Sequence, residues 1–235
     1  MDFSLERLRQ PLADMKYLLY RGYPKSIALD IVARKYPLSK PERSLLLRSL
    51  HTEDEIRMVK FKLAKDSSCI KDEVLSVDGF NVLITLESLI RGDPLLLCDD
   101  GIIRDIYTSF RKYKITDITF RALGLLFRII SSLRPRQVFV VYDAPISHSG
   151  KLAMRTREVM KSLNIQGDVM LSKKPNTTVA TLGILVASSD IVVISKAKRI
   201  VDLARMAIPY FPSAYVINVR ELYAPVLKDV LKKLI

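Results

Sequence analysis

Three aspartates stand where the chain could bring carboxylates together. Asp78 and Asp143 each come directly after a short apolar run, and Asp190 stands just before another, residues 191–194. If these runs are strands of one parallel sheet, the ends of the first two strands meet at a single edge, where open α/β sheets bind ligands. Asp190 joins the other two aspartates if its turn folds over that edge.

Such a cluster has the chemistry of a metal site. Carboxylates gathered in one crevice repel one another unless a cation lies among them. The chain has only 2 histidines and 2 cysteines, too few for a zinc site or a disulfide framework. Oxygen ligands favour Mg²⁺ or Mn²⁺. An aspartate after a strand is also a common helix cap, but three of them in a basic protein favour a metal site.

The elements that must position these acids are those of an α/β fold. From residue 73 onward, short apolar runs alternate with helical patterns, which predicts βα units and a mainly parallel α/β/α sandwich. The expected strands are residues 74–77, 138–142, 169–171, 191–194 and 215–219, with 95–98 either a short strand or a turn. The expected helices are residues 80–90, 102–113, 116–133, 149–163, 198–207 and 221–234.

The segment before this region shows helical periodicity only. One helix start is marked by the capping box of Ser39 and Glu42. We therefore expect a small all-helical domain, 1–70, followed by the α/β domain, 71–235. The short helices have the outline of a helix-turn-helix, but no base-reading residues stand out, so packing on a neighbour is the favoured role.

The formal net charge of +13 favours a polyanionic partner, which could be RNA, DNA or an anionic membrane surface, and nucleic acid is the favoured one. Several cations follow Asp143 on a predicted helix, at spacings of four that place them in pairs on its faces, and two more follow the next strand. Each could hold an RNA backbone or be an ordinary surface charge. They are Lys151, Arg155, Arg157, Lys161, Lys173 and Lys174.

Several other classes of protein are disfavoured. No apolar run is long enough to span a bilayer, so a cytoplasmic protein without membrane contact is expected. The chain has no G-x-x-x-x-G-K phosphate loop and no G-x-G-x-x-G after its first predicted strand, which argues against P-loop NTPases and dinucleotide oxidoreductases.

The motifs around the aspartates resemble those of the PIN-like nuclease superfamily, including its NYN branch. The pattern D-G-x-N occurs as Asp78-Gly79-Phe80-Asn81, and Asp143 and Asp190 follow in the expected order, the latter after two serines. The similarity covers residues 74–217. The whole chain also looks like an archaeal family in which a helical domain of unknown function precedes a PIN-like part.

The resemblance implies a Rossmann-like sheet and a Mg²⁺- or Mn²⁺-dependent endoribonuclease that acts on single-stranded or structured RNA. Asp78, Asp143 and Asp190 would be catalytic metal ligands. Asn81 would donate a hydrogen bond to Asp78, and Ser188 would be a second supporting residue. A fourth acid on an early helix is expected. The candidates are Glu87, Asp99, Asp100 and, slightly preferred and expected on the helix 102–113, Asp105.

Two other functions stay open. If no fourth acid reaches the pocket, a catalytically degenerate RNA-binding protein becomes the better interpretation. A metal-dependent phosphatase or phosphotransferase could use the same crevice on a small substrate. The sequence also leaves the oligomeric state open, including a homodimer.

Overall fold

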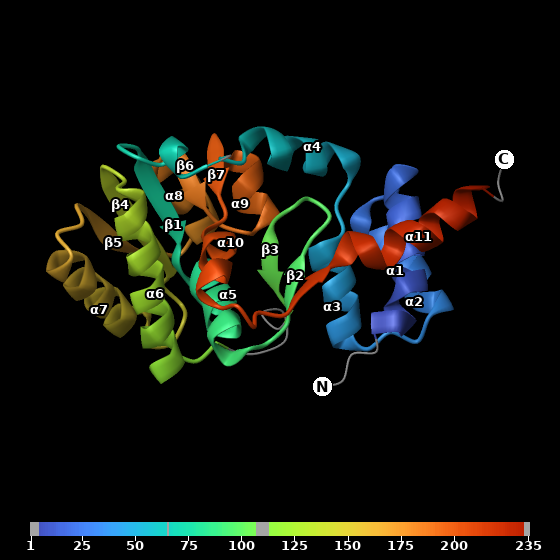
Figure 1. The fold of residues 1–235 in the computed structure, drawn as a ribbon, viewed down its shortest axis with the longest axis horizontal. Coiled ribbons are helices and arrows are strands. Elements are labelled where there is room, and N and C mark those ends of the chain that lie inside the picture. The colour runs from blue at the N-terminus through green and yellow to red at the C-terminus, as the bar shows by residue number, and fades with distance from the viewer. Residues whose placement is uncertain (1–4, 65, 107–112, 233–235) are drawn as a thin grey trace. The chain divides into compact units, whose positions relative to one another are not determined.

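The computed structural model describes residues 5–64, 66–106 and 113–232 of the 235-residue chain (Figure 1). The chain folds as two compact units, and neither is continuous in sequence. The α/β unit comprises residues 61–93 and 112–215. The N-terminal unit comprises residues 1–60, 94–111 and 216–235.

A five-stranded parallel sheet forms the centre of the α/β unit, with strand order β5-β4-β1-β6-β7. The strands are β1 (Val74–Asp78), β4 (Gln137–Asp143), β5 (Gly167–Ser172), β6 (Leu185–Ala187) and β7 (Arg199–Val201). Leu75 and Val77 in β1 and Val138 and Val140 in β4 are fully buried. Such continuous burial is expected of parallel strands that are covered by helices on both faces.

Helices cover both faces of this sheet. Helices α5, α6 and α10 pack together on one face, and α8 packs against β1 and β4 on the other (Figure 1). The α-helices of the unit are α5 (Gly79–Arg91), α6 (Asp117–Leu133), α7 (Ser149–Ser162), α8 (Pro175–Leu182), α9 (Ile191–Lys196) and α10 (Leu203–Ala207). Two short 3₁₀ turns, η1 (Ser67–Cys69) and η2 (Ile208–Tyr210), complete it. The predicted α/β class with a mainly parallel sheet is confirmed.

The N-terminal unit combines helices with a small sheet of order β3-β2-β8. Its elements are α1 (Leu5–Tyr20), α2 (Lys25–Lys35), α3 (Lys40–Ser49), α4 (Glu53–Lys62), β2 (Leu95–Leu97), β3 (Ile103–Asp105), β8 (Val216–Asn218) and α11 (Val219–Lys232). Helix α4 runs two residues past residue 60, where the first of the three segments of this unit ends. The capping box of Ser39 and Glu42 is present, with the Ser39 amide donating to Glu42 Oε2 at 2.7 Å.

The division into units differs from the predicted boundary near residue 70. The apolar face of α1, with Leu8, Leu12 and Met15, is buried in one core with Ile217 and Tyr223 from the end of the chain. Covering this face therefore takes segments that are distant in sequence, which local periodicity does not reveal. Among the described residues, no helix is both long and apolar enough to cross a membrane.

Four predicted elements differ from the structure. The predicted helix 198–207 contains strand β7 at Arg199–Val201, and only Leu203–Ala207 is helical, as α10. Residues 191–194 form part of helix α9 and not a strand, and the strand of this region is β6, six residues earlier. The predicted helix 102–113 contains strand β3 at Ile103–Asp105, and residues 107–112 lie outside the described part of the chain. The strand near residue 216 is β8, which pairs with β2 in the small sheet.

Candidate active site at the carboxyl edge of the sheet

Three aspartates follow three adjacent strands of the parallel sheet. Asp78 ends β1, Asp143 ends β4, and Asp190 comes three residues after the last residue of β6. Because β4, β1 and β6 are neighbours and run in one direction, all three residues lie at the carboxyl edge. We expected Asp190 in a turn that precedes a strand and folds over this edge. It instead follows strand β6 and lies at the edge for that reason.

Asp78 is the most buried of the three, with 6 % of its surface exposed. Its Oδ2 accepts a hydrogen bond from the Ser188 hydroxyl at 2.8 Å. Although Asp78 precedes α5, its side chain makes no capping hydrogen bond. The nearby backbone amide of Asn81 lowers the pKa of Asp78 less than the Ser188 hydroxyl does. Burial raises the pKa of Asp78 to about 7, and the negative charges of Asp190 and Asp143 add to this rise.

Asn81 fixes the loop after β6 instead of contacting Asp78 through its side chain. Its Oδ1 accepts hydrogen bonds from the Ser189 amide at 2.8 Å and from the Ser189 hydroxyl at 3.0 Å. The side-chain hydrogen bond to Asp78 that the resemblance implied is therefore made by Ser188. Asn81 positions the segment that carries Ser188 and Asp190.

Asp190 serves partly as a helix cap. Its Oδ1 accepts the Val192 amide of α9 at 2.8 Å, and its Oδ2 accepts from Asn176 Nδ2 at 3.2 Å. Its own amide donates to the Ser188 hydroxyl at 3.1 Å. The capping alternative is thus correct for Asp190, and each of its oxygens keeps a lone pair for a further ligand.

Asp143 differs from the other two in lacking a donor. Its side chain is half-buried, and no hydrogen-bond donor or cation contacts its carboxylate within the described parts of the chain. Burial raises the pKa of this carboxyl group. A partly buried carboxylate without a compensating partner is costly unless a cation or a proton supplies one.

The cluster is open rather than closed around one point. In the described residues, the one group of three His, Cys, Asp or Glu side chains with ligand atoms all within 4.8 Å of one another is His51, Asp99 and Asp100. The three edge aspartates are therefore more widely spaced than an all-protein cage requires. Mg²⁺ is usually held by one or two carboxylates together with waters and substrate phosphates, so the open arrangement suits this ion.

Gly79 allows the strand-to-helix turn that holds Asp78. A Cβ atom at this position would lie 2.3 Å from Cε1 of Tyr142 and 2.9 Å from the Val141 carbonyl oxygen. The Tyr142 ring is fully buried, packs against Phe80 and bonds Thr156 through its hydroxyl at 2.9 Å. Tyr142 is therefore a core residue.

Of the candidates for a fourth acid, Glu87 lies in the α/β unit, whereas Asp99, Asp100 and Asp105 belong to the N-terminal unit. Glu87 is buried, and it lies nine residues after Asp78, which is about 13 Å along the axis of α5. It accepts hydrogen bonds from Thr119, at 2.7 Å, and from Tyr113. Asp105 was expected on a helix but lies in strand β3 of the N-terminal unit, where Arg48 Nη2 contacts it at 3.0 Å.

A further acid that the sequence motifs did not single out lies at the carboxyl edge. Asp202 directly follows β7, is 8 % exposed and caps α10 by accepting the Arg205 amide at 2.9 Å. The signal was present in the sequence, because Asp202 follows the apolar pair Ile200-Val201 just as Asp78 and Asp143 follow theirs. It lies one strand beyond β6, and so further from β1 than Asp190.

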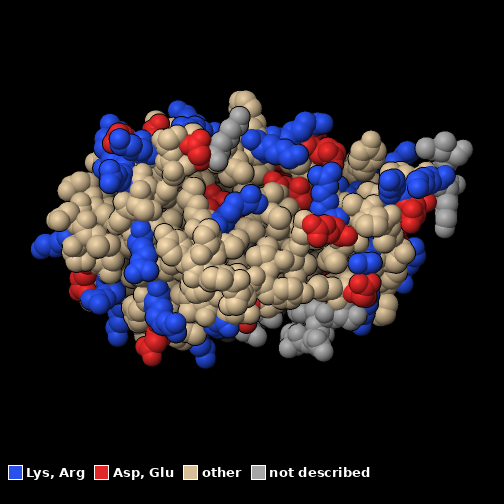
Figure 2. All heavy atoms as spheres, in the orientation of Figure 1, with Lys and Arg blue, Asp and Glu red and all other residues tan. Residues whose placement is uncertain are grey.

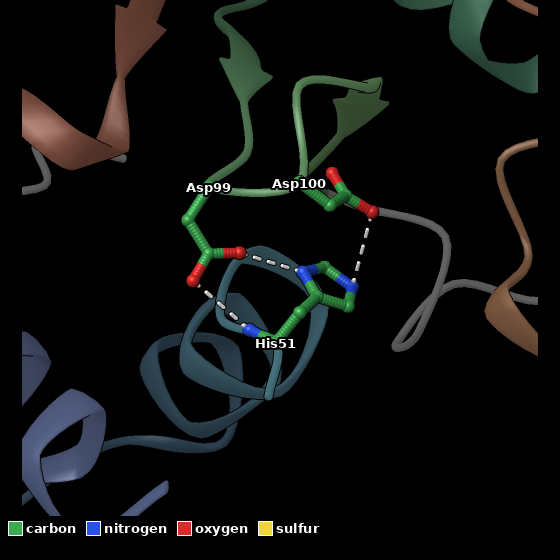
Figure 3. A group of neighbouring side chains, drawn as sticks. All are labelled: His51, Asp99 and Asp100. Atoms are coloured by element: carbon green, nitrogen blue, oxygen red, sulfur yellow. Dashed lines mark hydrogen bonds and ion pairs between the residues drawn. The ribbon is translucent and has the colours of Figure 1, made fainter. Parts of the chain in front are cut away.

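His51, Asp99 and Asp100 form a buried polar cluster within the N-terminal unit (Figure 3). His51 Nδ1 lies 2.8 Å from Asp99, and its Nε2 lies 3.4 Å from Asp100. Lys16 Nζ contacts Asp99 at 3.0 Å, and Arg104 binds both oxygens of Asp100 at 2.8 and 2.6 Å. Because each carboxylate already has a cation as partner, this group is a buried ionic network, and a metal ion would have to displace those partners.

The predicted basic residues fall into two groups. Lys173 and Lys174 directly follow β5, whose Ser172 pairs with Asp143, and Lys151 lies in the first turn of α7. These three are exposed and near the carboxyl edge.

The other basic residues of this set are further along α7 or at the opposite edge. Arg155 pairs with Glu158 at 2.7 Å. Arg157 pairs with Asp168 at the start of β5, at 2.8 Å, and lines a cavity there together with Lys161. Arg157 and Lys161 therefore lie away from the three aspartates, because α7 runs back to the amino edge. Figure 2 shows Lys and Arg side chains dispersed over the visible face with acids among them, and not gathered in one patch.

Comparisons with known proteins give families without an assigned activity. Residues 67–206 match the family described as Domain of unknown function (DUF5616), and residues 7–62 match Protein of unknown function (DUF434). Uncharacterized protein MJ0935 of Methanocaldococcus jannaschii is 38% identical over 208 residues, which cover 88% of this chain and 98% of that protein. No solved structure matches the chain.

Proposed function

We propose that this chain, which belongs to the DUF5616 family, is a metal-dependent endoribonuclease that hydrolyses RNA phosphodiesters at the carboxyl edge of its parallel sheet. The observation that carries the proposal is the placement of Asp78, Asp143 and Asp190 after three adjacent strands. Their charges act on one another, since Asp143 and Asp190 both raise the pKa of Asp78.

The donor set fits Mg²⁺ or Mn²⁺. The ligand atoms on offer are carboxylate oxygens, and Asp143 has no donor or cation of its own among the described residues. When bound, the ion would lower the pKa of a water molecule and offset charge on the leaving oxygen. Asp143 and Asp78 would be its ligands, and Asp190 would contribute the lone pairs that capping leaves free.

The remaining residues of the edge orient these groups. Ser188 holds the Asp78 carboxylate, and Asn81 holds the loop that carries Ser188. With a pKa of about 7, Asp78 is about half protonated at neutral pH and must lose this proton before it can act as a ligand. Lys173 and Lys174, exposed beside Asp143, would contact the RNA backbone on either side of the scissile phosphate.

The test is cleavage of a labelled single-stranded RNA by purified protein at millimolar Mn²⁺, with and without EDTA. We expect cleavage that EDTA abolishes and that Asp143→Asn reduces by about 100-fold or more, because a ligand of the ion is lost. The matched control is Asp72→Asn, an exposed position two residues before β1 and thus at the amino edge, which should cleave as the wild type does.

Two outcomes would contradict the proposal. Wild-type protein that binds RNA but never cleaves it with any divalent ion would identify a non-catalytic RNA-binding protein. Hydrolysis of small phosphate esters that depends on Asp143, without cleavage of RNA, would identify a phosphatase.

A further inference from the structure

A groove in the N-terminal unit lies between helices α1 and α11, with a volume of about 610 Å³. Its walls come from the end of α1 and from most of the length of α11, two helices that pack closely against each other. The groove contains none of the acids proposed for catalysis. Its lining combines cations with tyrosines and aliphatic side chains.

The cation at the base of the groove is already neutralised. Lys16 is 5 % exposed, and its Nζ contacts the His51 carbonyl oxygen at 2.8 Å, Asp99 at 3.0 Å and Glu53 at 3.1 Å. These contacts use the three N–H donors of the ammonium group, so Lys16 supports the base of the groove and is not available to a ligand.

The cations along α11 are in the opposite situation. Arg220, Lys228 and Lys232 line the groove, are exposed, and make no ion pair within the described parts of the chain. Lys228 and Lys232 are four residues apart and share one helix face, and Arg220 lines the same groove about two turns earlier, so the three form a row along it. Glu53 is the acid that lines the groove, and Lys16 is its partner. The row is therefore an uncompensated positive strip beside a concave surface.

Tyrosines of α1 face this strip. Tyr20 is 67 % exposed and Tyr17 is half-buried, while Tyr223 of α11 is buried beneath them. Exposed aromatic rings that flank a positively charged groove are the means by which proteins bind single-stranded nucleic acid, because bases stack on the rings and phosphates meet the cations. An acidic peptide would meet the cations equally well but would gain nothing from stacking on Tyr20.

We propose that the α1–α11 groove binds a segment of single-stranded RNA, with phosphates along Arg220, Lys228 and Lys232 and a base stacked on Tyr20. The inference shares an RNA ligand with the proposed nuclease function but does not depend on cleavage. It assigns RNA binding to the N-terminal unit, independently of the carboxyl edge of the parallel sheet.

The test is fluorescence anisotropy of a labelled 12-nucleotide single-stranded RNA with the full chain carrying Asp143→Asn, so that the probe stays intact. Lys228→Glu with Lys232→Glu should weaken binding at least tenfold and lower the slope of log Kd against log salt by about 1.4, the value for two lost phosphate contacts on a single strand. Tyr20→Leu should weaken binding about tenfold, whereas Tyr20→Phe, which keeps the ring, should bind as the parent does.

Matched controls separate the groove from general charge. Arg34→Glu with Lys40→Glu makes the same change of charge at exposed positions of α2 and α3 that do not line the groove, and should have less than a threefold effect. Equal losses in the two charge-reversed variants would overturn the proposal. Equal binding by Tyr20→Phe and Tyr20→Leu would also overturn it. A third contrary result would be that Lys228→Glu with Lys232→Glu abolishes binding to phosphatidylglycerol vesicles and leaves RNA binding unchanged. Groove-dependent RNA binding in a protein that never cleaves RNA would refute the nuclease function and leave this inference intact.

Discussion

The hydroxyl of Ser188 donates a hydrogen bond to the buried carboxylate of Asp78 at 2.8 Å. The same oxygen accepts the amide hydrogen of Asp190 at 3.1 Å. One serine thus links two of the three acids, and it is held in place because β6 pairs with β1, with Val77 opposite Ala187. The geometry of the acidic edge is set by sheet pairing and not by a flexible connection between the acids.

Ser188→Ala should shift the pH dependence of cleavage rather than lower it uniformly. The hydrogen bond from Ser188 lowers the pKa of Asp78, so its loss should raise that pKa by about one unit, as expected for a hydrogen bond to a charged group. The acidic limb of the pH–rate profile should move upward, with about a fivefold loss at pH 7 that disappears by pH 9. The control is Ser195→Ala, whose hydroxyl donates to the Val192 carbonyl oxygen. An equal loss at every pH would show that Ser188 acts only structurally.

The raised pKa of Asp78 predicts that the metal-free protein loses stability as the pH rises. The folded pKa of about 7 exceeds the ordinary value of 3.8, so the folded state binds the proton more tightly than the unfolded state between these values. The free energy of unfolding should therefore fall from about pH 4 to about pH 7, by at most roughly 4 kcal/mol, and this contribution should be constant above pH 7.

Asp78→Asn provides the test of this linkage. The variant should be more stable than the wild type at pH 8 and close to it at pH 4, because the amide carries no charge at either pH. Urea unfolding in EDTA at several pH values measures the difference. A stability gap that does not change with pH would show that Asp78 does not titrate with a raised pKa.

The parts of this site that depend on local sequence were predictable, and those that depend on distant contacts were not. Asp78 and Asp143 were placed correctly because each directly follows an apolar strand. Asp190 was assigned to the wrong strand, since the β-branched run 191–194 fits a strand pattern but forms a helix that Asp190 caps. Short β6, with only three residues, gave a weaker signal.

The sequence predicts helices before residue 70, but it does not reveal which distant segments complete the N-terminal unit. Strand β8 and helix α11 join α1 across nearly the whole length of the chain, and β2 and β3 join them from the middle. Nothing in the pattern of residues 94–106 distinguishes a strand of the main sheet from a strand of a second one. For the same reason Asp105, the preferred fourth acid, was expected on a helix of the α/β domain, whereas it lies in strand β3 of the N-terminal unit.

Gly79→Ala should destabilise the protein although alanine is the better helix former. The added Cβ would overlap the Tyr142 ring, 2.3 Å away, so the buried ring or β4 must move, at a cost of about 2 kcal/mol. Gly124→Ala is the matched control, because Gly124 lies inside α6 with no atom within 4 Å of the added carbon, and it should stabilise the protein by about 0.5–1 kcal/mol. Thermal or urea unfolding measures both. A neutral Gly79→Ala would contradict the close approach of Tyr142.

Thermal shifts with Mn²⁺ should distinguish the two groups of potential metal ligands. Ions that bind only the folded state raise the Tm, so wild-type protein should show an increase that grows with the Mn²⁺ concentration. Asp143→Ala should abolish this increase, because it removes the carboxylate without a partner at the sheet edge. His51→Gln should lower the Tm in the absence of metal, since it disrupts the contacts of His51 with Asp99 and Asp100, but should keep the increase.

The reason for this difference is the state of the carboxylates. Asp99 and Asp100 are already bound to Lys16 and Arg104, so an ion entering beside His51 would leave a buried cation without a partner, which costs about 3–5 kcal/mol. The pKa of His51 is lowered by its burial, so the imidazole stays neutral near pH 7 and the network keeps its balance of charges. An Mn²⁺-dependent increase that is lost in His51→Gln and kept in Asp143→Ala would place the ion in the N-terminal unit and remove the basis for a metal-dependent active site at the sheet edge.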